Sequence, residues 1–298
     1  MRNLLSAYWL RPETALWRAC DMRAMQDFEF VSPSLDLGCG DGVFSFLRAG
    51  GQFPAAFDVF SVSSLDKYFE AVDVYDAAVK VETEIHRGPR YKIDIGVDHK
   101  ANLLRKAEVL GLYSNLLEAD LNSHWPFPDG TIASLFSNII YWLDDPAHAF
   151  AEVRRILRKG GKACVLLPDV TLRDYSFYWS LCVKPADERF RFLEDLDRGR
   201  LADNIKQAKT FDEWKKLMLA SGLSIDRHRQ YLPKHVVQIW DVGLRPLFPV
   251  LYKLASAADK NLLPAIKEEW INTFERFFVP LLKLEGPGAF HYFMLSKP

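Results

Sequence analysis

The chain has 298 residues, of which 49% are hydrophobic and 26% are charged. This length and apolar content can fill a substantial core, so we expect one large domain that carries insertions. Lysine and arginine (38) nearly balance aspartate and glutamate (39), which gives a formal net charge of -1. A near-neutral chain has no overall attraction to nucleic acids or anionic membranes, and we expect no nucleic-acid partner.

Cysteine usage and the N-terminus bear on location. Four cysteines stand apart from one another, without the spacing of zinc ligands or CxxC motifs, and we expect free thiols in a reducing compartment. The first apolar run is interrupted at 11–13 before any cleavage site, so it is not a convincing signal peptide. No stretch approaches the roughly 18 to 20 apolar residues that span a bilayer. We therefore expect a soluble, cytoplasmic protein.

The first half of the chain alternates strands with helices. Pro12 suits the first turn of a helix over 12–28, and we assign residues 1–33 to an N-terminal helical cap. Short apolar runs predict strands over 35–37, 92–97, 116–118, 131–136 and 162–167. Helical periodicity predicts helices over 43–47, 100–110 and 146–158, the last stopped by Gly160 and Gly161. This alternation predicts an α/β fold with a doubly wound, mostly parallel sheet.

The distance between the first two strands is unusually long. In such a unit the second strand ordinarily follows the glycine turn within about 15 to 20 residues. We therefore expect an insertion over 51–91. A competing alignment makes residues 55–58 the second strand, since their spacing is the ordinary one. We prefer the strand that ends at Asp98, because the helix and strand after it continue the unit without gaps.

The chain beyond Pro168 is less regular. We expect two helical insertions on the substrate side, over 169–210 and 236–285. The first holds four neighbouring aromatic residues: Tyr175, Phe177, Tyr178 and Trp179. In the second, prolines are expected to cut the apolar run into short helices: Pro246, Pro249, Pro264 and Pro280. Strands over 223–229 and 289–295 bring the total to seven and would form a closing hairpin around the second insertion.

The most informative motif is the turn after the first strand, with the sequence SLDLGCGDGV over 34–43. Gly38, Gly40 and Gly42 permit positive φ and let backbone amides approach a ligand closely. Dinucleotide sites space their glycines as GxGxxG, whereas this turn reads GxGxG. Two further strand ends carry acidic residues, Asp98 and Asp120.

Five motifs carry a family resemblance: LDLGCGDG, GVDHK, EADLNSHWPFPDG, SNIIYWLDD and EVRRILRKGGK. They resemble the general small-molecule group of the class I S-adenosylmethionine (SAM) dependent methyltransferases. The resemblance covers residues 34–168, and more loosely 211–229 and 289–296. It implies a Rossmann-like methyltransferase fold, SAM as the cofactor and a transferase activity. The insertions lie outside the shared pattern and leave the substrate open.

The amino acid end of SAM requires a close backbone approach. Under the resemblance, it would lie against Gly38, Gly40 and Gly42, with Cys39 inside the turn. Two further residues would hold its ammonium group. Asp36 would receive it directly or through water, and a carbonyl of Asn138 would hold it from the other side.

The nucleoside end needs other groups. An ionised carboxylate at the end of the neighbouring strand accepts from both ribose hydroxyls, and Asp98 occupies that place. His99 would then flank the adenine. The Asp120 side chain would accept from the adenine amino group, while the Leu121 amide donates to a ring nitrogen.

Methyl transfer from a sulfonium depends mainly on alignment, since the leaving group departs neutral. Methylation of an oxygen or carbon acceptor can require a base, but His86, His124 and His148 are more simply structural, so we assign no catalytic residue. Tyr141 and Trp142 should face the substrate side, unless they pack in the core. No histidine pair or acidic cluster has metal-ligand spacing, and we expect no required metal.

The acceptor is expected to be a small or medium, partly apolar organic molecule, with O-methylation slightly favoured over N or C. The aromatic cluster and the apolar insertion would form its pocket or lid, or else a second core layer or a homodimer surface. Two other functions stay open from the sequence. One is a noncatalytic SAM-binding or interaction protein, and the other is a nicotinamide-dependent reductase.

Overall fold

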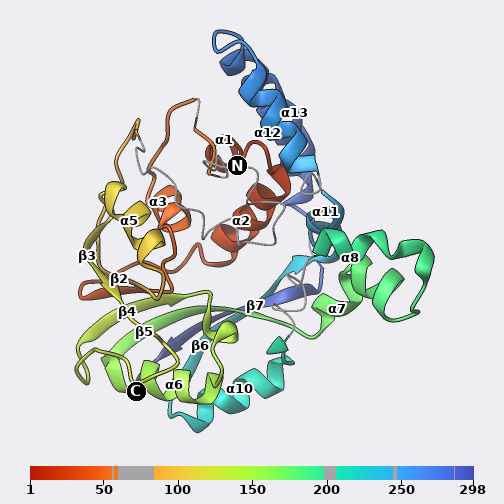
Figure 1. Cartoon of the computed structure of the whole chain (residues 1–298). Helices are drawn as coiled ribbons and strands as arrows, with labels where there is room; N and C mark the ends of the chain where they lie inside the picture. Colours follow the sequence, from red (N-terminus) through yellow and green to blue (C-terminus); the bar gives the residue numbers. More distant parts are fainter. Residues whose placement is uncertain (56, 60–83, 198–205, 244–246, 285) are drawn as a thin grey trace.

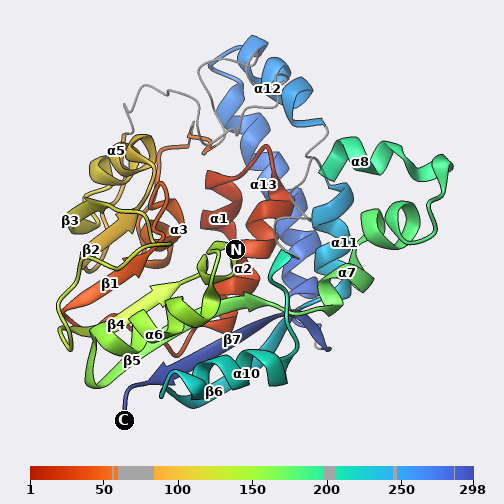
Figure 2. The same cartoon turned by 60° about the horizontal axis from the view of Figure 1, so that its bottom comes forward.

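The computed structural model describes residues 1–298 except 56, 60–83, 198–205, 244–246 and 285. A twisted sheet separates two layers of helices, and further helices extend the molecule beyond one end of the sheet (Figures 1 and 2). In the described part of the chain, no helix is both long and apolar enough to cross a membrane.

Seven strands form a single sheet in the order β3-β2-β1-β4-β5-β7-β6. Their bounds are Ser34–Leu37 (β1), Ile93–Asp98 (β2), Tyr113–Glu118 (β3), Ile132–Ser137 (β4), Leu157–Pro168 (β5), Ser224–Pro233 (β6) and Gly288–Ser296 (β7). All pairings are parallel except the two made by β7, which lies antiparallel between β5 and β6. The predicted doubly wound, mostly parallel sheet is confirmed, as is the closing hairpin of β6 and β7.

Alternation along the strands divides the core between the two faces of the sheet. On one face, Phe136 and Cys164 pack with residues of α2 (Pro12–Ala24). Ser45 of α3 (Val43–Arg48) bonds to β1 on that same face, and α5 (Ala101–Val109) completes the layer. Helices α6 (Pro146–Ile156) and α10 (Phe211–Ala220) cover the other face (Figure 2).

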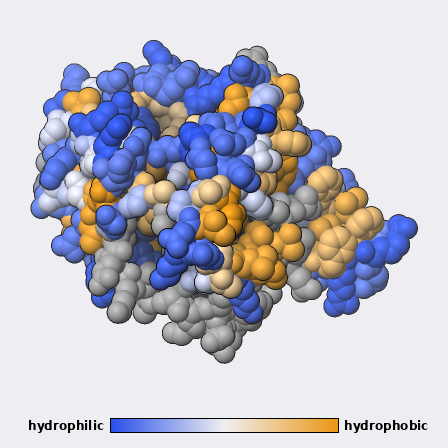
Figure 3. Space-filling model, turned by 90° about the horizontal axis from the view of Figure 1, so that it is seen from above, coloured by the Kyte–Doolittle hydropathy of each residue, from blue (hydrophilic) through white to orange (hydrophobic). Residues whose placement is uncertain are grey.

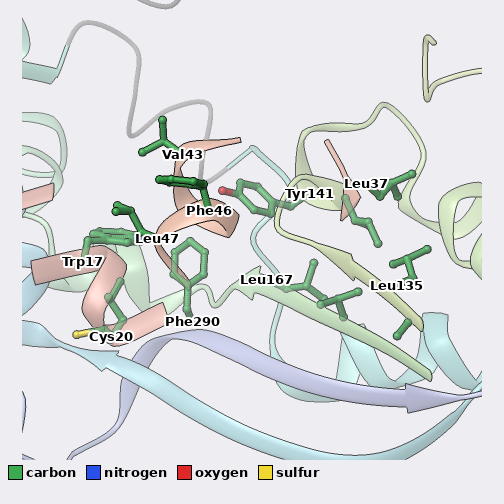
Figure 4. Packing of buried hydrophobic residues seen from close by; sticks show 14 of the residues in the cluster. Trp17, Cys20, Leu37, Val43, Phe46, Leu47, Leu135, Tyr141, Leu167 and Phe290 are labelled. Carbon is green, nitrogen blue, oxygen red and sulfur yellow. The ribbon is translucent and has the colours of Figure 1, made fainter. Parts of the chain in front are cut away.

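The centre of the sheet is apolar and buried. Leu37, Leu135 and Leu167 come from three neighbouring strands, and each side chain is fully buried (Figure 4). Full burial of a leucine contributes about 1.5 to 3 kcal/mol, so this apolar centre supports the strand ends that follow it.

The strand that ends at Asp98 is the true second strand. Leu35, Asp36 and Leu37 of β1 pair with Ile95, Gly96 and Val97 of β2. The alternative, residues 55–58, forms no strand where the structure describes it. Asp58 is instead buried, and its carboxylate accepts a hydrogen bond from the Leu10 amide.

The predicted insertion over 51–91 is described only at its two ends. Gln52 and Arg87 pair there as an isolated bridge. The larger part of the insertion, 60–83, lies outside the described residues. Parts of the other two insertions, 198–205 and 244–246 with 285, lie outside them as well.

The sequence predictions about which glycines and prolines end helices are wrong at two places, the first of them at Gly160 and Gly161. Helix α6 ends at Ile156, so Gly160 and Gly161 do not stop it but lie inside β5. The pairing of β4 with β5 shifts register there, and a side chain on Gly161 would meet the Ile132 carbonyl oxygen at 2.9 Å. The glycines therefore form a strand irregularity against the neighbouring backbone.

The prolines of the C-terminal insertion mostly begin helices instead of cutting them. Pro249 and Pro264 stand in the first turns of α12 (Phe248–Ala257) and α13 (Leu263–Leu281), where a missing amide hydrogen costs nothing. Pro280 lies inside the last turn of α13 and does not break it. Pro246 lies outside the described residues. The insertion begins with α11 (Lys234–Val242).

The remaining short helices frame the N-terminus and the region after β5. They are α1 (Arg2–Ala7), η2 (Ile140–Trp142), α7 (Thr171–Tyr175), η3 (Tyr178–Val183), η4 (Glu188–Phe190) and α8 (Phe192–Asp197). The aromatic residues of η3 and its approach are half-buried, not enclosed.

An ion pair fastens the loop between β3 and β4. The Arg155 guanidinium donates to both carboxylate oxygens of Glu152, at 2.7 and 2.8 Å. It also donates to the carbonyl oxygens of Trp125 and Phe127. The same Glu152 carboxylate accepts the Trp125 amide, and these bonds lower the Glu152 pKa from 4.5 to about 2, with the Arg155 hydrogen bond the largest cause.

This pair generates a pH dependence. A carboxyl whose pKa is depressed by folding stabilises the protein above its unfolded pKa and loses that stabilisation as the pH falls toward the folded pKa. Between pH 4.5 and 3, the wild type should therefore lose about 1 kcal/mol per pH unit more than the Glu152→Gln variant. Urea unfolding at each pH measures the difference. The exposed pair of Glu188 offers the control, since Glu188→Gln should leave the slope unchanged.

Candidate active site

Four strand ends meet side by side at the carboxyl edge of the sheet. In the sheet order they are β3, β2, β1 and β4. Asp120 follows β3, Asp98 ends β2, the glycine turn follows β1, and Asn138 follows β4. The structure thus brings all four predicted elements to one edge, where ligands bind in open α/β sheets.

Hydrogen bonds join the glycine turn to the end of β2. The amides of Gly38 and Cys39 both donate to the Val97 carbonyl oxygen, at 2.9 and 2.8 Å. The Gly40 amide donates to one carboxylate oxygen of Asp98 at 3.0 Å, and the Lys100 amide donates to the other at 3.0 Å. The shape of the turn therefore depends on the Asp98 carboxylate.

Two glycines of the turn serve different purposes. A Cβ on Gly38 would lie 2.2 Å from Cγ1 of Ile139. Gly38 has no side chain because the Ile139 side chain takes up that space. Gly40 has a φ of +56° and nothing within 4 Å of the place a Cβ would take. Gly40 therefore leaves backbone open to a ligand, while Gly38 is required by packing.

Asp36 lies beneath the turn and is almost completely buried, at 2% exposure. One of its carboxylate oxygens accepts from the Ser45 hydroxyl at 2.6 Å and from the Tyr113 hydroxyl at 2.7 Å. Burial raises the Asp36 pKa to about 6 against the opposing effect of these bonds. Asp36 was expected to receive the ammonium group of SAM. One of its carboxylate oxygens is instead bonded to two protein hydroxyls.

Tyr113 was not identified from the sequence. Tyr113 is the first residue of β3, and its ring passes over β2 to reach Asp36 on β1. The passage is free because Gly96 has no side chain, and a Cβ there would lie 2.8 Å from the Tyr113 ring. A glycine inside a strand marks such a close approach, so Gly96 was the available signal.

A cation stands among the carboxylates around the turn. The Arg18 guanidinium of α2 lies 5.2 Å from the centroid of the Phe44 ring, at the start of α3. It also donates to Asp21 at 3.1 Å. Burial raises the Asp41 pKa, and the positive charge of Arg18 is among the effects that oppose this shift. The Asp41 carboxylate accepts the Val43 amide at 3.1 Å and so occupies the N-terminus of α3.

The predicted nucleoside side is more open. The His99 side chain is 66% exposed, with Nδ1 3.5 Å from Asp98. The exposed Asp120 carboxylate accepts the Asn122 amide at 2.9 Å. Leu121 is buried and also borders an open pocket of about 330 Å³. That pocket is lined by Leu121, Asn122, Ser123, His124, Asp144, Asp145 and His148.

The remaining candidates are Cys39 and three histidines. Burial raises the Cys39 pKa far above its ordinary value, so its thiol stays protonated. His86 is exposed, His124 lies 3.3 Å from Glu152, and His148 lies 3.4 Å from the Ser123 carbonyl oxygen. Among the described residues, no group of three or more histidine, cysteine or acidic side chains could hold a metal ion.

Tyr141 and Trp142 of η2 differ in burial. Trp142 is 58% exposed, whereas Tyr141 is buried and packs edge-on against Phe290 at 5.9 Å between ring centroids. In Figure 4 the Tyr141 hydroxyl points toward the side of α3 that carries Phe46. Burial raises the Tyr141 pKa, so the hydroxyl can donate a hydrogen bond but is a poor base.

A comparison with protein families bears on this site. Residues 87–165 match the family model described as a methyltransferase domain. This part of the chain is a methyltransferase domain. SAM is its cofactor, and methyl transfer is its enzymatic activity. The matched stretch contains Asp98, Asp120 and Asn138 but begins after the glycine turn, which the geometry above adds to it.

Solved structures of similar fold are distant in sequence. A SAM-dependent methyltransferase of Mesorhizobium loti is 15% identical, with 94% of this chain and 99% of that chain covered and a TM-score of 0.49. One from Thermotoga maritima is 15% identical, covers 96% and 92%, and scores 0.48. A geranyl diphosphate methyltransferase in complex with SAM is 14% identical, covers 96% and 90%, and scores 0.46. No curated protein matches the chain in sequence.

The two glycines give a matched pair of substitutions. Gly38→Ala places a methyl group against Ile139 and should destabilise this methyltransferase by at least about 2 kcal/mol. Gly40→Ala meets no neighbour and should cost only about 1 kcal/mol of backbone strain, yet weaken SAM about tenfold. Thermal unfolding and calorimetric titration separate the two. Equal SAM affinity in wild type and Gly40→Ala would show that no ligand approaches this backbone.

Proposed function

We propose that the carboxyl edge of β1, β2, β3 and β4 holds SAM with the residues predicted from the sequence. The turn residues 38–42 would lie along its amino acid end, with Asn138 on the far side. Asp98 would hold the ribose, while His99, Asp120 and Leu121 would surround the adenine. What supports this is their position at four adjacent strand ends, with open backbone at Gly40.

The charges around the turn support a cationic cofactor. The Asp98 carboxylate occupies the Gly40 amide, and the Asp41 carboxylate occupies the first amide of α3. A dinucleotide would need the first amides of α3 for its pyrophosphate and would meet the Asp41 carboxylate there, whereas an acidic residue at the end of the second strand, such as Asp98, suits both cofactors. SAM carries an ammonium and a sulfonium, for which nearby carboxylates are favourable. The nicotinamide alternative is therefore disfavoured.

The side chains present fit the amino acid end, the ribose and the adenine of SAM, and they include Arg18, which no sequence motif indicated. The guanidinium of Arg18, over the Phe44 ring at the start of α3, would pair with the carboxylate of the amino acid end. Asp36 would act from below, because its bonds to Ser45 and Tyr113 fix the strand that carries the turn. Its role would then be to position the turn.

The bound cofactor supplies a methyl group carried on a positively charged sulfur. After transfer, the rest of the cofactor is a neutral thioether. The chain therefore needs to align an acceptor and exclude water rather than protonate a leaving group. Tyr141 is suited to orient an acceptor through its protonated hydroxyl. We assign no general base.

The acceptor proposed is a small or medium, partly apolar organic molecule, with O-methylation slightly favoured. Aromatic side chains from α2, η2, α11 and β7 support an apolar acceptor. Trp17 lies 4.6 Å from Trp240 and 5.4 Å from Phe290 between ring centroids, and Phe290 packs against Tyr141. A cytoplasmic location and a homodimer remain predictions, and all four cysteines are free thiols.

The cofactor site is tested by replacing Asp98. Asp98→Asn keeps the shape of the side chain but loses the charge that the ribose diol and the Gly40 amide would share. SAM affinity should fall by about 1 to 3 kcal/mol, or about five- to 150-fold. Calorimetric titration with SAM, and with NADH in parallel, measures this. NADH binding that exceeds SAM binding in the wild type would refute the assignment.

The acceptor is tested by transfer of labelled methyl groups from SAM to fractionated small molecules. We expect label in a fraction of intermediate polarity, and loss of most of it with Tyr141→Phe if the hydroxyl orients the acceptor. Trp142→Phe, at the neighbouring exposed position, is the control. Label that appears only in the most polar fraction would contradict an apolar acceptor.

A further inference from the structure

Asp21 of α2 is buried, although hydrophilic residues cover much of the face of this protein that is seen from above (Figure 3). Its exposed fraction is only 2%. One of its carboxylate oxygens accepts from the Tyr231 hydroxyl at 2.8 Å, and the other accepts from the Arg18 guanidinium at 3.1 Å. Removing a carboxylate from water is costly even when it is paired and bonded, so packing alone does not explain its position.

A second tyrosine–aspartate pair with the same bond length offers a comparison. The Tyr292 hydroxyl donates to Asp27 at 2.8 Å. Arg229 donates to both carboxylate oxygens of Asp27, at 2.9 and 2.7 Å, and its hydrogen bonds are the largest cause of a lowered Asp27 pKa. The Asp21 pKa is raised instead, because burial outweighs its ion pair and hydrogen bonds. Asp21 is therefore the carboxylate of the two that accepts a proton more readily.

The Tyr231 ring borders the aromatic group proposed above for the acceptor. Its centroid lies 6.1 Å from that of Phe290, which the Tyr141 ring also approaches at 5.9 Å. The negative charge of Asp21 adds to the effect of burial that raises the Tyr141 pKa, so these groups lie near one another. The aromatic wall thus contains one polar corner, formed by the Asp21 carboxylate and the hydroxyls of Tyr141 and Tyr231.

The backbone around Tyr231 is held in an unfavourable conformation. Leu232, the next residue, is fully buried and has a φ of +69°, in the left-handed region that residues with a side chain rarely adopt. On the neighbouring strand, Gly288 approaches so closely that a Cβ there would lie 1.8 Å from the Tyr231 carbonyl oxygen. Backbone strain persists where the surrounding structure enforces it, and it is often found at functional sites. This strain supports a role for Tyr231 beyond packing.

We propose that Tyr231 and Asp21 together remove the proton from a hydroxyl group of the acceptor during methyl transfer. An unactivated hydroxyl is a weak nucleophile at neutral pH, so a proton acceptor beside it accelerates the reaction. This deepens the proposed function, on which it rests. It supplies the proton acceptor left open there and commits the acceptor to an apolar alcohol or phenol.

The transfer forms one bond to carbon and breaks another. The acceptor oxygen bonds to the methyl carbon while the carbon–sulfur bond breaks and its electron pair stays on sulfur. The acceptor proton passes to the Tyr231 oxygen, and the Tyr231 proton passes to Asp21 along the 2.8 Å hydrogen bond. Asp21 ends as a neutral carboxyl group, and Tyr231 again carries a neutral hydroxyl.

Replacement of the two tyrosines tests the proposal with matched variants. Tyr231→Phe removes the hydroxyl that would relay the proton and keeps the ring. Transfer of labelled methyl groups from SAM to naphthol, to phenylethanol and to the small-molecule fractions should fall at least about 100-fold, while SAM affinity in calorimetry stays unchanged. Tyr292→Phe alters the comparison pair and should keep the wild-type rate. For naphthol the loss in Tyr231→Phe should shrink as the pH rises, because naphthol then ionises without help.

A second variant tests the other member of the pair. Asp21→Asn keeps the shape of the side chain and removes the final proton acceptor. Its loss of methyl transfer should equal that of Tyr231→Phe. The two changes together should cost no more than either alone, since both act on one proton.

Urea unfolding without SAM gives a readout that is independent of turnover. The wild type should lose stability relative to Asp21→Asn as the pH rises above 3.8, the ordinary pKa, because its folded form keeps the proton longer. Relative to Asp27→Asn, the wild type should instead lose stability as the pH falls below 3.8. A change of the same sign for both variants would overturn the role of Asp21. The titratable and charged groups that face Asp21 are Arg18 and Cys20 of α2, Tyr141 of η2 and Tyr231 of β6.

The remaining outcomes separate this proposal from the cofactor site. Label found only on nitrogen or carbon would overturn the proposal. So would a wild type that binds SAM but methylates no hydroxyl acceptor, or a Tyr231→Phe variant as active as Tyr292→Phe. A wild type that fails to bind SAM would overturn the cofactor site and this proposal with it.

Discussion

The contact on which the rest of the site depends is that between the Asp98 carboxylate and the Gly40 amide. It joins the turn after β1 to the end of β2, and the Lys100 amide on the other oxygen fixes the direction of the carboxylate. Under the proposed function, the negative charge that shapes the turn would also favour a cationic ligand beside it. In this methyltransferase the fold positions the groups, and the chemistry is largely a matter of alignment.

A buried polar link supports that contact from below. Asp36 is taken out of water at a cost that raises its pKa to about 6, and the hydroxyls of Ser45 and Tyr113 offset part of that cost. Because Tyr113 comes from β3 and crosses β2 above Gly96, three strands are fixed relative to one another just before the turn. The carboxyl edge can then present open backbone at Gly40 without losing its shape.

Much of this fold could be predicted from local sequence, and the exceptions share a cause. Strands and helices from β1 to β5 followed from period and turn residues, because each element buries its own apolar pattern. The choice of Asp98 over Asp58 was correct since the following elements continued the unit. The roles of Gly160, Gly161 and Pro280 were wrong, because a breaker's effect depends on strand register and on its place within a helical turn. Tyr113 and Arg18 were missed because their partners, Asp36 and the start of α3, lie on other elements.

A crystal structure with S-adenosylhomocysteine tests the account most directly. The account predicts the ribose diol within hydrogen-bond distance of the Asp98 carboxylate and the amino acid end against the backbone at Gly40. Nucleoside density elsewhere, with Asp98 still bonded only to the Gly40 and Lys100 amides, would contradict it.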